Sequence, residues 1–357
     1  MPNEGSTFEF GRSMRSHFLL DDDYIPLNHG SYGTYPKVVR EALQGYRDRI
    51  ESNPDKFIRR DLESELHKAR EAVAKFINVE VNEIVFVLNA TTGINAILKS
   101  LKYEKGDKLL YLSTVYSSIR ELLNFIRENN QETVELVEIE ANYPLSDDDL
   151  IDRFVKVIQE ENQKPNTRIK LAVIDSISSQ PGVIFPLQRL IPILRQNDIL
   201  SIVDGAHAIG QIPLDIKEMN PDFFVTNCHK CPYLTIHAAL EFREKIGGEE
   251  KIRNYCKKLA IEGGNKIASI LGTEIIGPES VIQNMVNIRL PIPVSNKEFS
   301  DRKFMNLMFN NYNFAVAIFE HNGHWYIRAS AQIYTDMEDF EKVGHFVKEI
   351  CDSFLSA

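Results

Sequence analysis

Residues 200–203 and 223–226 are short apolar runs of the kind that form buried parallel strands, and polar residues follow each of them. Asp204 follows the first run directly, and Lys230 comes shortly after the second. Ligands bind outside the carboxyl ends of the strands in an open parallel sheet, so we expect both side chains at one rim. A carboxylate can keep a pyridine nitrogen protonated, and a lysine amine can form a Schiff base. This pair of groups predicts pyridoxal 5'-phosphate as the cofactor.

The elements that would position these residues form an α/β pattern, a mainly parallel sheet wrapped by helices. Apolar runs predict strands at residues 84–88, 108–112, 134–139, 170–175, 200–203 and 223–226. Helical periodicity lies between them at residues 92–101, 117–128, 146–161 and 187–195.

The flanking parts of the chain differ from this pattern and predict a smaller α+β domain at the C-terminus. Helices are expected at residues 36–51, 61–76, 247–271 and 337–354, and short strands at 286–290 and 325–330. We therefore expect an N-terminal segment at residues 1–35, a large cofactor-binding domain at 36–245 and a small domain at 246–357.

Composition and charge exclude several classes of protein. The chain has 357 residues and a formal net charge of −10, so it lacks the basic excess that binding to nucleic acid requires. Residues 1–20 mix charged and apolar side chains, unlike a signal peptide, and no later stretch is apolar enough to span a membrane. The expected location is cytoplasmic. Cys228 and Cys231 form a lone CxxC pair, for which we expect no metal site.

Five motifs together resemble the class V aminotransferase family of fold-type I pyridoxal-phosphate enzymes, which includes cysteine desulfurases and isopenicillin N epimerase. They are LNHGSYGTYP at 27–36, NATTGIN at 89–95, DGAHAIG at 204–210, His229-Lys230, and YIRAS at 326–330. Within that family the chain is similar to fungal hercynylcysteine sulfoxide lyases of ergothioneine biosynthesis. The resemblance implies a homodimer that acts on a small-molecule amino-acid substrate.

The resemblance also implies roles for single residues. Lys230 would carry the Schiff base and the proton, with Asp204 beside the pyridine nitrogen and His207 near the phenolic oxygen of the cofactor. Arg328 would hold the α-carboxylate of the substrate through a two-pronged contact. The remaining cofactor-binding positions are Thr91, Thr92 and Gly93 at a phosphate turn, Tyr116 on the ring, Ser179 in a facing loop, and Asn227 and His229 beside the lysine.

Most of these positions also have a structural interpretation. Asp204 and Thr91 could cap the helices that follow them, and Tyr116 could pack in a core at a helix start. His29 could face the substrate or satisfy a turn, so we leave it out of the catalytic set.

The chain departs from the family immediately after Lys230. Relatives continue with a strand, a long connection and a turn that supplies a threonine to the phosphate of the neighbouring subunit's cofactor. Here CPYLTIHAALEFREKIGG follows at once, and its residues 233–246 predict the helix found beyond that segment in the family. Loss of a strand from a sheet buried on both faces would expose apolar surface, at roughly 25 cal/mol per Å².

Four functions remain open at this stage. The leading hypothesis is a lyase that breaks the carbon–sulfur bond of a cysteine-derived sulfoxide, and an epimerase or an aminotransferase would share its first proton removal. We disfavour a desulfurase, because it would need a mobile nucleophilic cysteine, whereas Cys256 and Cys351 lie in helical patterns, where we expect them to be buried in packing. The hypothesis of another class is a truncated, catalytically inactive relative.

Overall fold

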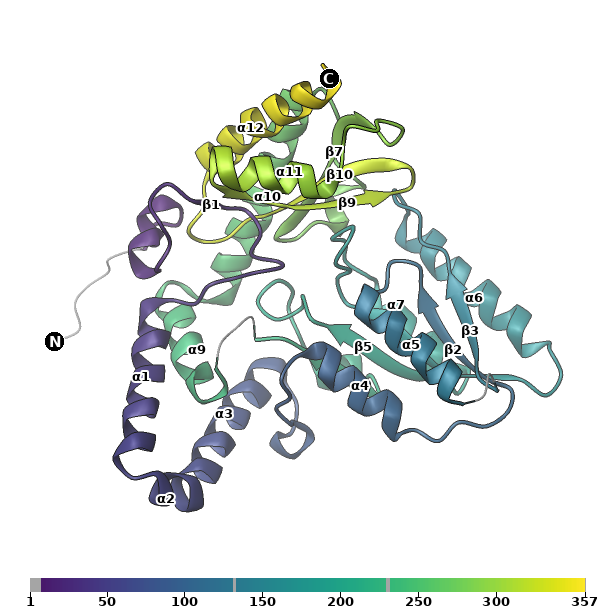
Figure 1. Ribbon diagram of the computed structural model, residues 1–357. Helices are drawn as coiled ribbons and strands as arrows, with labels where there is room; N and C mark the ends of the chain where they lie inside the picture. The colour runs from purple at the N-terminus through teal and green to yellow at the C-terminus, as the bar shows by residue number, and fades with distance from the viewer. Residues whose placement is uncertain (1–7, 131–132, 229–231, 357) are drawn as a thin grey trace. The chain divides into compact units, whose positions relative to one another are not determined.

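The computed structural model describes residues 8–130, 133–228 and 232–356, so the predicted site residues His229 and Lys230 lie outside the described residues. The chain divides into two compact units (Figure 1). One unit comprises Val87–Ile209 and Pro213–Asn227, and the other comprises Met1–Phe86, Gly210–Ile212 and Cys228–Ala357. No helix of the described residues is long and apolar enough to cross a membrane.

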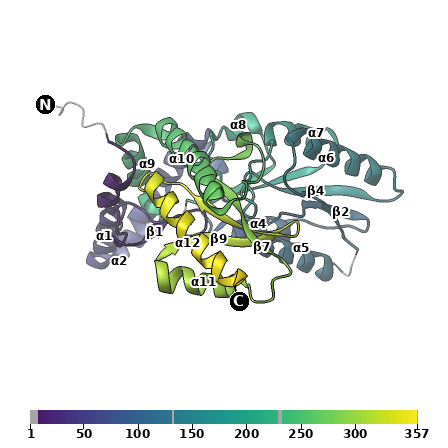
Figure 2. The same cartoon turned by 90° about the horizontal axis from the view of Figure 1, so that it is seen from above.

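The first unit contains a parallel sheet in the order β3-β2-β4-β5-β6, which confirms the predicted α/β fold class. Its strands are β2 (Asp107–Leu112), β3 (Glu135–Ile139), β4 (Arg168–Asp175), β5 (Leu200–Gly205) and β6 (Phe223–Thr226). Its helices are α4 (Ala90–Ser100), α5 (Ser117–Asn129), α6 (Asp147–Asn162), α7 (Leu187–Gln196) and α8 (Ile216–Met219). Figure 2 shows α4 and α5 on one face of this sheet and α6 and α7 on the other.

The core of this unit explains why its strands are continuous apolar runs. Ile94 and Leu98 of α4 and Leu123 of α5 are fully buried against Leu109 of β2 and Leu171 of β4. Because helices cover both faces of the sheet, alternate residues of each strand enter different apolar layers. The sheet thereby becomes a rigid platform whose carboxyl rim can hold polar groups.

Buried charges at the amino ends of the strands are paired. Asp107 at the start of β2 is 1% exposed and accepts hydrogen bonds from Arg168 Nε at 2.7 Å and Lys170 Nζ at 2.9 Å. Burial raises the pKa of Asp107, but hydrogen bonds from Arg168, the Glu104 amide and Lys170 outweigh it, and the pKa lies below its usual value. Asp107 is therefore a compensated buried charge.

The second unit contains an antiparallel sheet in the order β7-β10-β9 and a short parallel pair, β1 with β8. Its strands are β1 (Ile25–Pro26), β7 (Met285–Pro293), β8 (Phe314–Ala315), β9 (Ala317–His321) and β10 (His324–Ser330). Its helices are α1 (Lys37–Ser52), α2 (Pro54–Lys56), α3 (Leu62–Ile77), α9 (Ile236–Lys245), α10 (Gly248–Leu271), α11 (Asp301–Leu307) and α12 (Met337–Leu355). Gly263 and Gly264 let α10 approach Phe340 of α12 and Val286 of β7 closely.

Short helical turns join these elements. The 3-10 turns are η1 (Arg12–His17), η3 (Val81–Glu83), η4 (Tyr233–Thr235) and η5 (Glu279–Val281), and the π turns are η2 (Phe57–Asp61) and η6 (Met308–Tyr312).

The predicted strand at residues 84–88 is wrong. These residues pair with no strand of the described chain, and the side chains of Val85 and Leu88 are 77% and 82% exposed. The described parallel sheet ends at β6. An apolar run forms a strand only beside another strand that accepts its backbone hydrogen bonds, and no described strand pairs with this run.

Candidate active site

The carboxyl ends of β4, β5 and β6 bring polar residues to one rim of the parallel sheet. Asp175 at the end of β4 is the register partner of Asp204 on β5, and Gly205 is the partner of Thr226 on β6. The backbone joins the three ends. The Ser176 amide donates to the Asp204 carbonyl at 2.9 Å, and Thr226 Oγ1 donates to the Gly205 carbonyl at 2.6 Å. The rim thus holds its side chains on a hydrogen-bonded frame.

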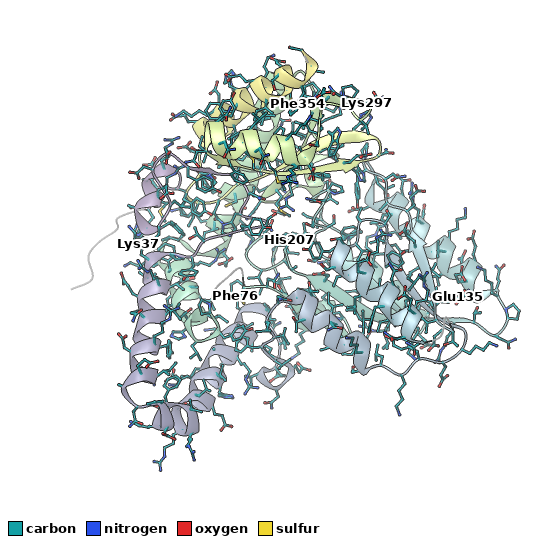
Figure 3. All side chains as sticks on the ribbon, viewed as in Figure 1. Lys37, Phe76, Glu135, His207, Lys297 and Phe354 are labelled. Atoms are coloured by element: carbon teal, nitrogen blue, oxygen red, sulfur yellow. The ribbon has the colours of Figure 1, made fainter. Side chains whose placement is uncertain are left out.

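Asp204 is a buried acid at this rim, as the sequence predicted. Its side chain is 5% exposed, and Oδ1 accepts a hydrogen bond from the Ala206 amide at 3.0 Å. Burial raises the pKa of Asp204, and the Ala206 hydrogen bond offsets only part of that rise. His207 is half-buried in the loop that follows β5, where Figure 3 labels it.

The first turn of α4 lies beside the end of β6. Asn227 Oδ1 accepts a hydrogen bond from the Ala90 amide at 3.0 Å, and Asn89 Oδ1 caps the helix by accepting from the Thr92 amide at 2.8 Å. The Gly93 amide donates to the Asn89 carbonyl at 3.1 Å. The amides of Thr92 and Gly93 are thus bound within the chain, so the Thr91 amide and the hydroxyls of Thr91 and Thr92 are the better candidates for a phosphate.

Gly93 also has a packing role that the sequence did not reveal. A Cβ atom at this position would lie 2.6 Å from Cγ1 of Val225 on β6. Real side chains do not approach so closely, so the absence of a side chain lets α4 settle on the sheet.

The other predicted cofactor contacts lie in loops of the same unit. Tyr116 is 46% exposed at the N-cap of α5, which fits a ring available for stacking better than a core position. Ser179 is half-buried in the loop after β4, next to Ser178, whose Oγ donates to the Pro181 carbonyl at 2.6 Å.

Arg328 belongs to the other unit, on β10. Its side chain is fully buried, and Nη2 donates to Ser31 Oγ at 2.6 Å and to Asn28 Oδ1 at 3.4 Å. Burial lowers its pKa to about 10. A Cβ atom on Gly30 would lie 3.1 Å from Nη2, so the 28–31 loop closes directly over the guanidinium. A desolvated, positioned guanidinium is well suited to bind a carboxylate.

His29 lies in the same loop as the arginine partners, and its Nδ1 atom is 2.6 Å from the buried hydroxyl of Tyr334. The sequence motif at 27–36 contained Asn28 and Ser31, but their contact with Arg328 could not be predicted because it joins residues about 300 positions apart.

Two of the described cysteines are unreactive. Cys256 and Cys351 are fully buried in α10 and α12, and burial raises the pKa of each thiol to about 12. Their expected packing role is confirmed. Cys228 is half-buried after β6, and Cys231 lies outside the described residues.

A parallel sheet wrapped by helices, with a buried acid at its carboxyl rim, is the arrangement expected of a fold-type I pyridoxal-phosphate enzyme. Residues 33–235 match the Aminotransferase class-V family, and the chain belongs to that family. The family uses pyridoxal phosphate, and the residues at the rim fit that group. Asp204 supplies a buried carboxylate to a nitrogen cation, and beside it Asp175 Oδ2 is fully buried without a hydrogen-bond partner among the described residues.

Relatives of known name cover nearly the whole chain. Hercynylcysteine sulfoxide lyase of Schizosaccharomyces pombe is 28% identical over 96% of this chain and 98% of its own. An L-cysteine desulfhydrase-like protein of Epichloe uncinata is 28% identical over 97% of both chains. The cystine C–S lyase C-DES has the same fold, with a TM-score of 0.75 at 16% identity over 92% of this chain and 98% of its own.

The alignments also bear on the expectation that a family segment is missing after Lys230. The alignment with the Schizosaccharomyces pombe lyase runs over 397 positions, although this chain has 357 residues, so the relative carries residues that this chain lacks. The family match ends at residue 235, close to the lysine.

Proposed function

We propose that this chain is a lyase that breaks the carbon–sulfur bond of a cysteine-derived sulfoxide, as in ergothioneine biosynthesis. The observation that carries the proposal is the 28% identity to hercynylcysteine sulfoxide lyase, which extends over 96% of this chain and 98% of that one. The chemistry of the rim agrees with it, since a buried acid beside the ring nitrogen favours removal of a proton from the bound amino acid.

In the proposed mechanism, bound pyridoxal phosphate supplies an electron sink for the bond that breaks at Cα. Asp204 holds a negative charge beside the ring nitrogen, and Arg328 binds the substrate α-carboxylate by two parallel hydrogen bonds. Lys230 would take the α-proton, and His207 would lie near the phenolic oxygen of the cofactor. The sulfur group then leaves from Cβ with the electrons of its bond, and water converts the remaining carbon skeleton to pyruvate and ammonia.

Cys256 and Cys351 favour a lyase over a desulfurase. A desulfurase passes sulfur to a thiolate, which requires an accessible cysteine with a low pKa. Burial raises the pKa of Cys256 and Cys351 to about 12 and removes both from solvent. Isopenicillin N epimerase of Streptomyces clavuligerus is 27% identical over only 60% of this chain, so an epimerase ranks below the lyase. An aminotransferase stays an alternative.

The test is product analysis with hercynylcysteine sulfoxide and, separately, L-cysteine. The purified chain with pyridoxal phosphate is expected to release pyruvate from the sulfoxide, while Lys230→Ala releases none. Borohydride reduction should fix the cofactor to Lys230, which peptide mapping would show. Inversion at Cα, or a keto acid formed with its sulfur group intact, would contradict the lyase and favour the epimerase or the aminotransferase. An absorbance that never shows bound cofactor would favour the inactive relative.

We also propose that the active form is a homodimer located in the cytoplasm. The support is the family membership, because the resemblance implies a site to which a neighbouring subunit contributes. Sedimentation of the cofactor-loaded chain would show one species of twice the monomer mass, and a monomer with full activity would contradict the dimer.

A further inference from the structure

A second acid, Asp175, lies beside Asp204 and has no role in the reaction as described. The two residues are register partners on adjacent parallel strands, so their side chains leave the same face of the sheet about 4.8 Å apart at the backbone. Each residue is 5% exposed. Asp175 Oδ2 has no hydrogen-bond partner in the described part of the chain, whereas Asp204 Oδ1 accepts from the Ala206 amide.

This pair is unlike the buried acid at the other end of the sheet. Asp107 is equally buried but accepts hydrogen bonds from Arg168 and Lys170. Among the described residues, no lysine or arginine forms an ion pair with Asp175 or Asp204. Two adjacent carboxylates that have no cation among the described residues cannot both be ionised at low cost when water is excluded, so we expect the pair to retain one proton.

We propose that Asp175 is a positioning residue for Asp204: it holds the proton of a buried carboxyl–carboxylate pair, so that the pair presents one negative charge, on Asp204, to the protonated ring nitrogen of the cofactor. Asp204 is the member whose oxygen is oriented by a backbone amide, and Asp175 is the member without a donor. This inference rests on the proposed use of Asp204 with pyridoxal phosphate, and is independent of which sulfur compound is cleaved.

The titration of the two acids agrees with this assignment. Burial and the charge of Asp204 raise the pKa of Asp175, and burial also raises the pKa of Asp204. Tyr143, in the loop after β3, is a further titratable group that interacts with Asp175. Burial also raises the pKa of Tyr143, so its phenol stays neutral at neutral pH and adds no charge.

The first test uses the full-length chain without cofactor. Protonated Asp175 contributes stability that is fully present below about pH 4, the pKa of a free aspartate, and is lost as the pH rises through the higher pKa of the folded state. Asn cannot ionise. We therefore expect Asp175→Asn to melt at a higher temperature than the wild type at pH 8. The difference in melting temperature between Asp175→Asn and the wild type should widen from about pH 4 and stop widening at the folded-state pKa of Asp175.

Asp107→Asn is the matched control from the same sheet. Its pKa is lowered, so the ionised carboxylate contributes stability that is present above about pH 4 and is lost only as the pH falls through the folded-state pKa. This variant should melt below the wild type by a constant amount from about pH 5 to about pH 9. Three outcomes for Asp175→Asn would overturn the proposal. The variant could be less stable than the wild type at pH 8, it could fail to fold, or its melting temperature could differ from that of the wild type by a constant amount over this pH range.

Asp204→Asn separates the effect of the pair from that of burial. In the Asp204→Asn background the neighbouring charge is absent. The melting-temperature difference that Asp175→Asn makes in this background should therefore stop widening at a lower pH than in the wild-type background. If that pH is the same in both backgrounds, Asp175 responds to burial alone, and the proposed pairing with Asp204 is overturned. These melting curves need no substrate, so failure of the lyase assay leaves them readable. Conversely, if the chain is an active lyase but the melting-temperature difference for Asp175→Asn does not change with pH, only Asp175 is removed from the mechanism.

The last measurement is made on the loaded enzyme. Asp175→Asn keeps the position neutral at every pH, so its kcat should lack the alkaline change that ionisation of Asp175 gives the wild type, with the substrate KM little altered. A pH profile identical to that of the wild type would contradict a role in the reaction.

Discussion

Asn227 joins the end of β6 to the first turn of α4, because its Oδ1 atom accepts a hydrogen bond from the Ala90 amide at 3.0 Å. Asn89 binds the Thr92 amide at 2.8 Å in the same turn. Two of the four amides that a helix start leaves without intrahelical partners are thus bound by side chains. The helix start is thereby fixed to the sheet rim that carries Asp204.

Removal of this connection should weaken cofactor binding. Asn227→Ala leaves the Ala90 amide without its acceptor, which costs about 1 kcal/mol, or about fivefold in the dissociation constant for pyridoxal phosphate. Titration with pyridoxal phosphate, followed by absorbance, measures this dissociation constant. Ser146→Ala is the control, since Ser146 caps α6 in the same way, accepting from the Asp149 amide at 3.1 Å. It should lower stability while leaving cofactor affinity unchanged. Equal losses of affinity in both variants would contradict a local role for Asn227.

Gly93 should tolerate no side chain while Val225 is present. Gly93→Ala would place Cβ 2.6 Å from Val225 Cγ1, and such overpacking costs about 1–3 kcal/mol in the free energy of unfolding. Adding Val225→Ala should recover part of the loss. At Gly45 in α1 a Cβ meets nothing within 4 Å, so Gly45→Ala should stabilise by about 0.5–1 kcal/mol. Denaturant unfolding measures the free energy of unfolding of Gly93→Ala, of the double variant and of Gly45→Ala. Without any recovery in the double variant, the glycine must be required for another reason, such as phosphate approach.

Arg328 should determine substrate affinity. Arg328→Lys removes the planar fork that matches a carboxylate, so a charge-assisted contact of about 1.5–3 kcal/mol is lost and KM should rise about tenfold to a hundredfold. Arg289→Lys on β7 is the control, because its ion pair with Glu274 is partly exposed. Its KM should stay near that of the parent. Steady-state kinetics with the sulfoxide decides. If Arg328→Lys binds substrate as tightly as the parent, Arg328 serves only the packing of its unit.

Much of the fold could be predicted from the sequence because strands buried on both faces are continuous apolar runs. The prediction of a strand at 223–226 matches β6, and that at 170–175 lies within β4. The same rule failed at 84–88, because an apolar run does not reveal whether a neighbouring strand exists. Strand pairing is a property of the whole sheet, which local composition cannot supply.

The candidate site could be predicted in part. The rule that side chains beyond strand ends face a ligand found Asp204 and Asn227, and Asp204 lies at the rim as expected. The rule missed Asp175 because that residue was taken as the last residue of a predicted strand. The partners of Arg328 come from a loop far away in the sequence, and periodicity carries no information about such contacts.

The last prediction concerns the segment that the sequence predicts to be missing after Lys230. We expect the present chain to bind pyridoxal phosphate weakly, and a chimera with the relative's segment inserted between Lys230 and Pro232 to bind it more tightly. The exposed side chains of Val85 and Leu88 support this, because a restored strand could pair with residues 84–88 and cover them. A restored phosphate contact of about 1.5–3 kcal/mol would tighten binding about tenfold to a hundredfold.

Cofactor titration of the chain and the chimera, followed by absorbance, tests this expectation. An insertion of equal length made from glycine and serine is the control, since it lengthens the connection without adding apolar side chains or a phosphate-binding turn. The relative's segment should also protect the backbone amides of residues 84–88 from hydrogen exchange, which the glycine–serine insertion should not do. Equally tight binding by all three proteins would mean that the rim of Asp204, Asn227 and α4 holds the cofactor unaided. The missing segment would then be no obstacle to catalysis.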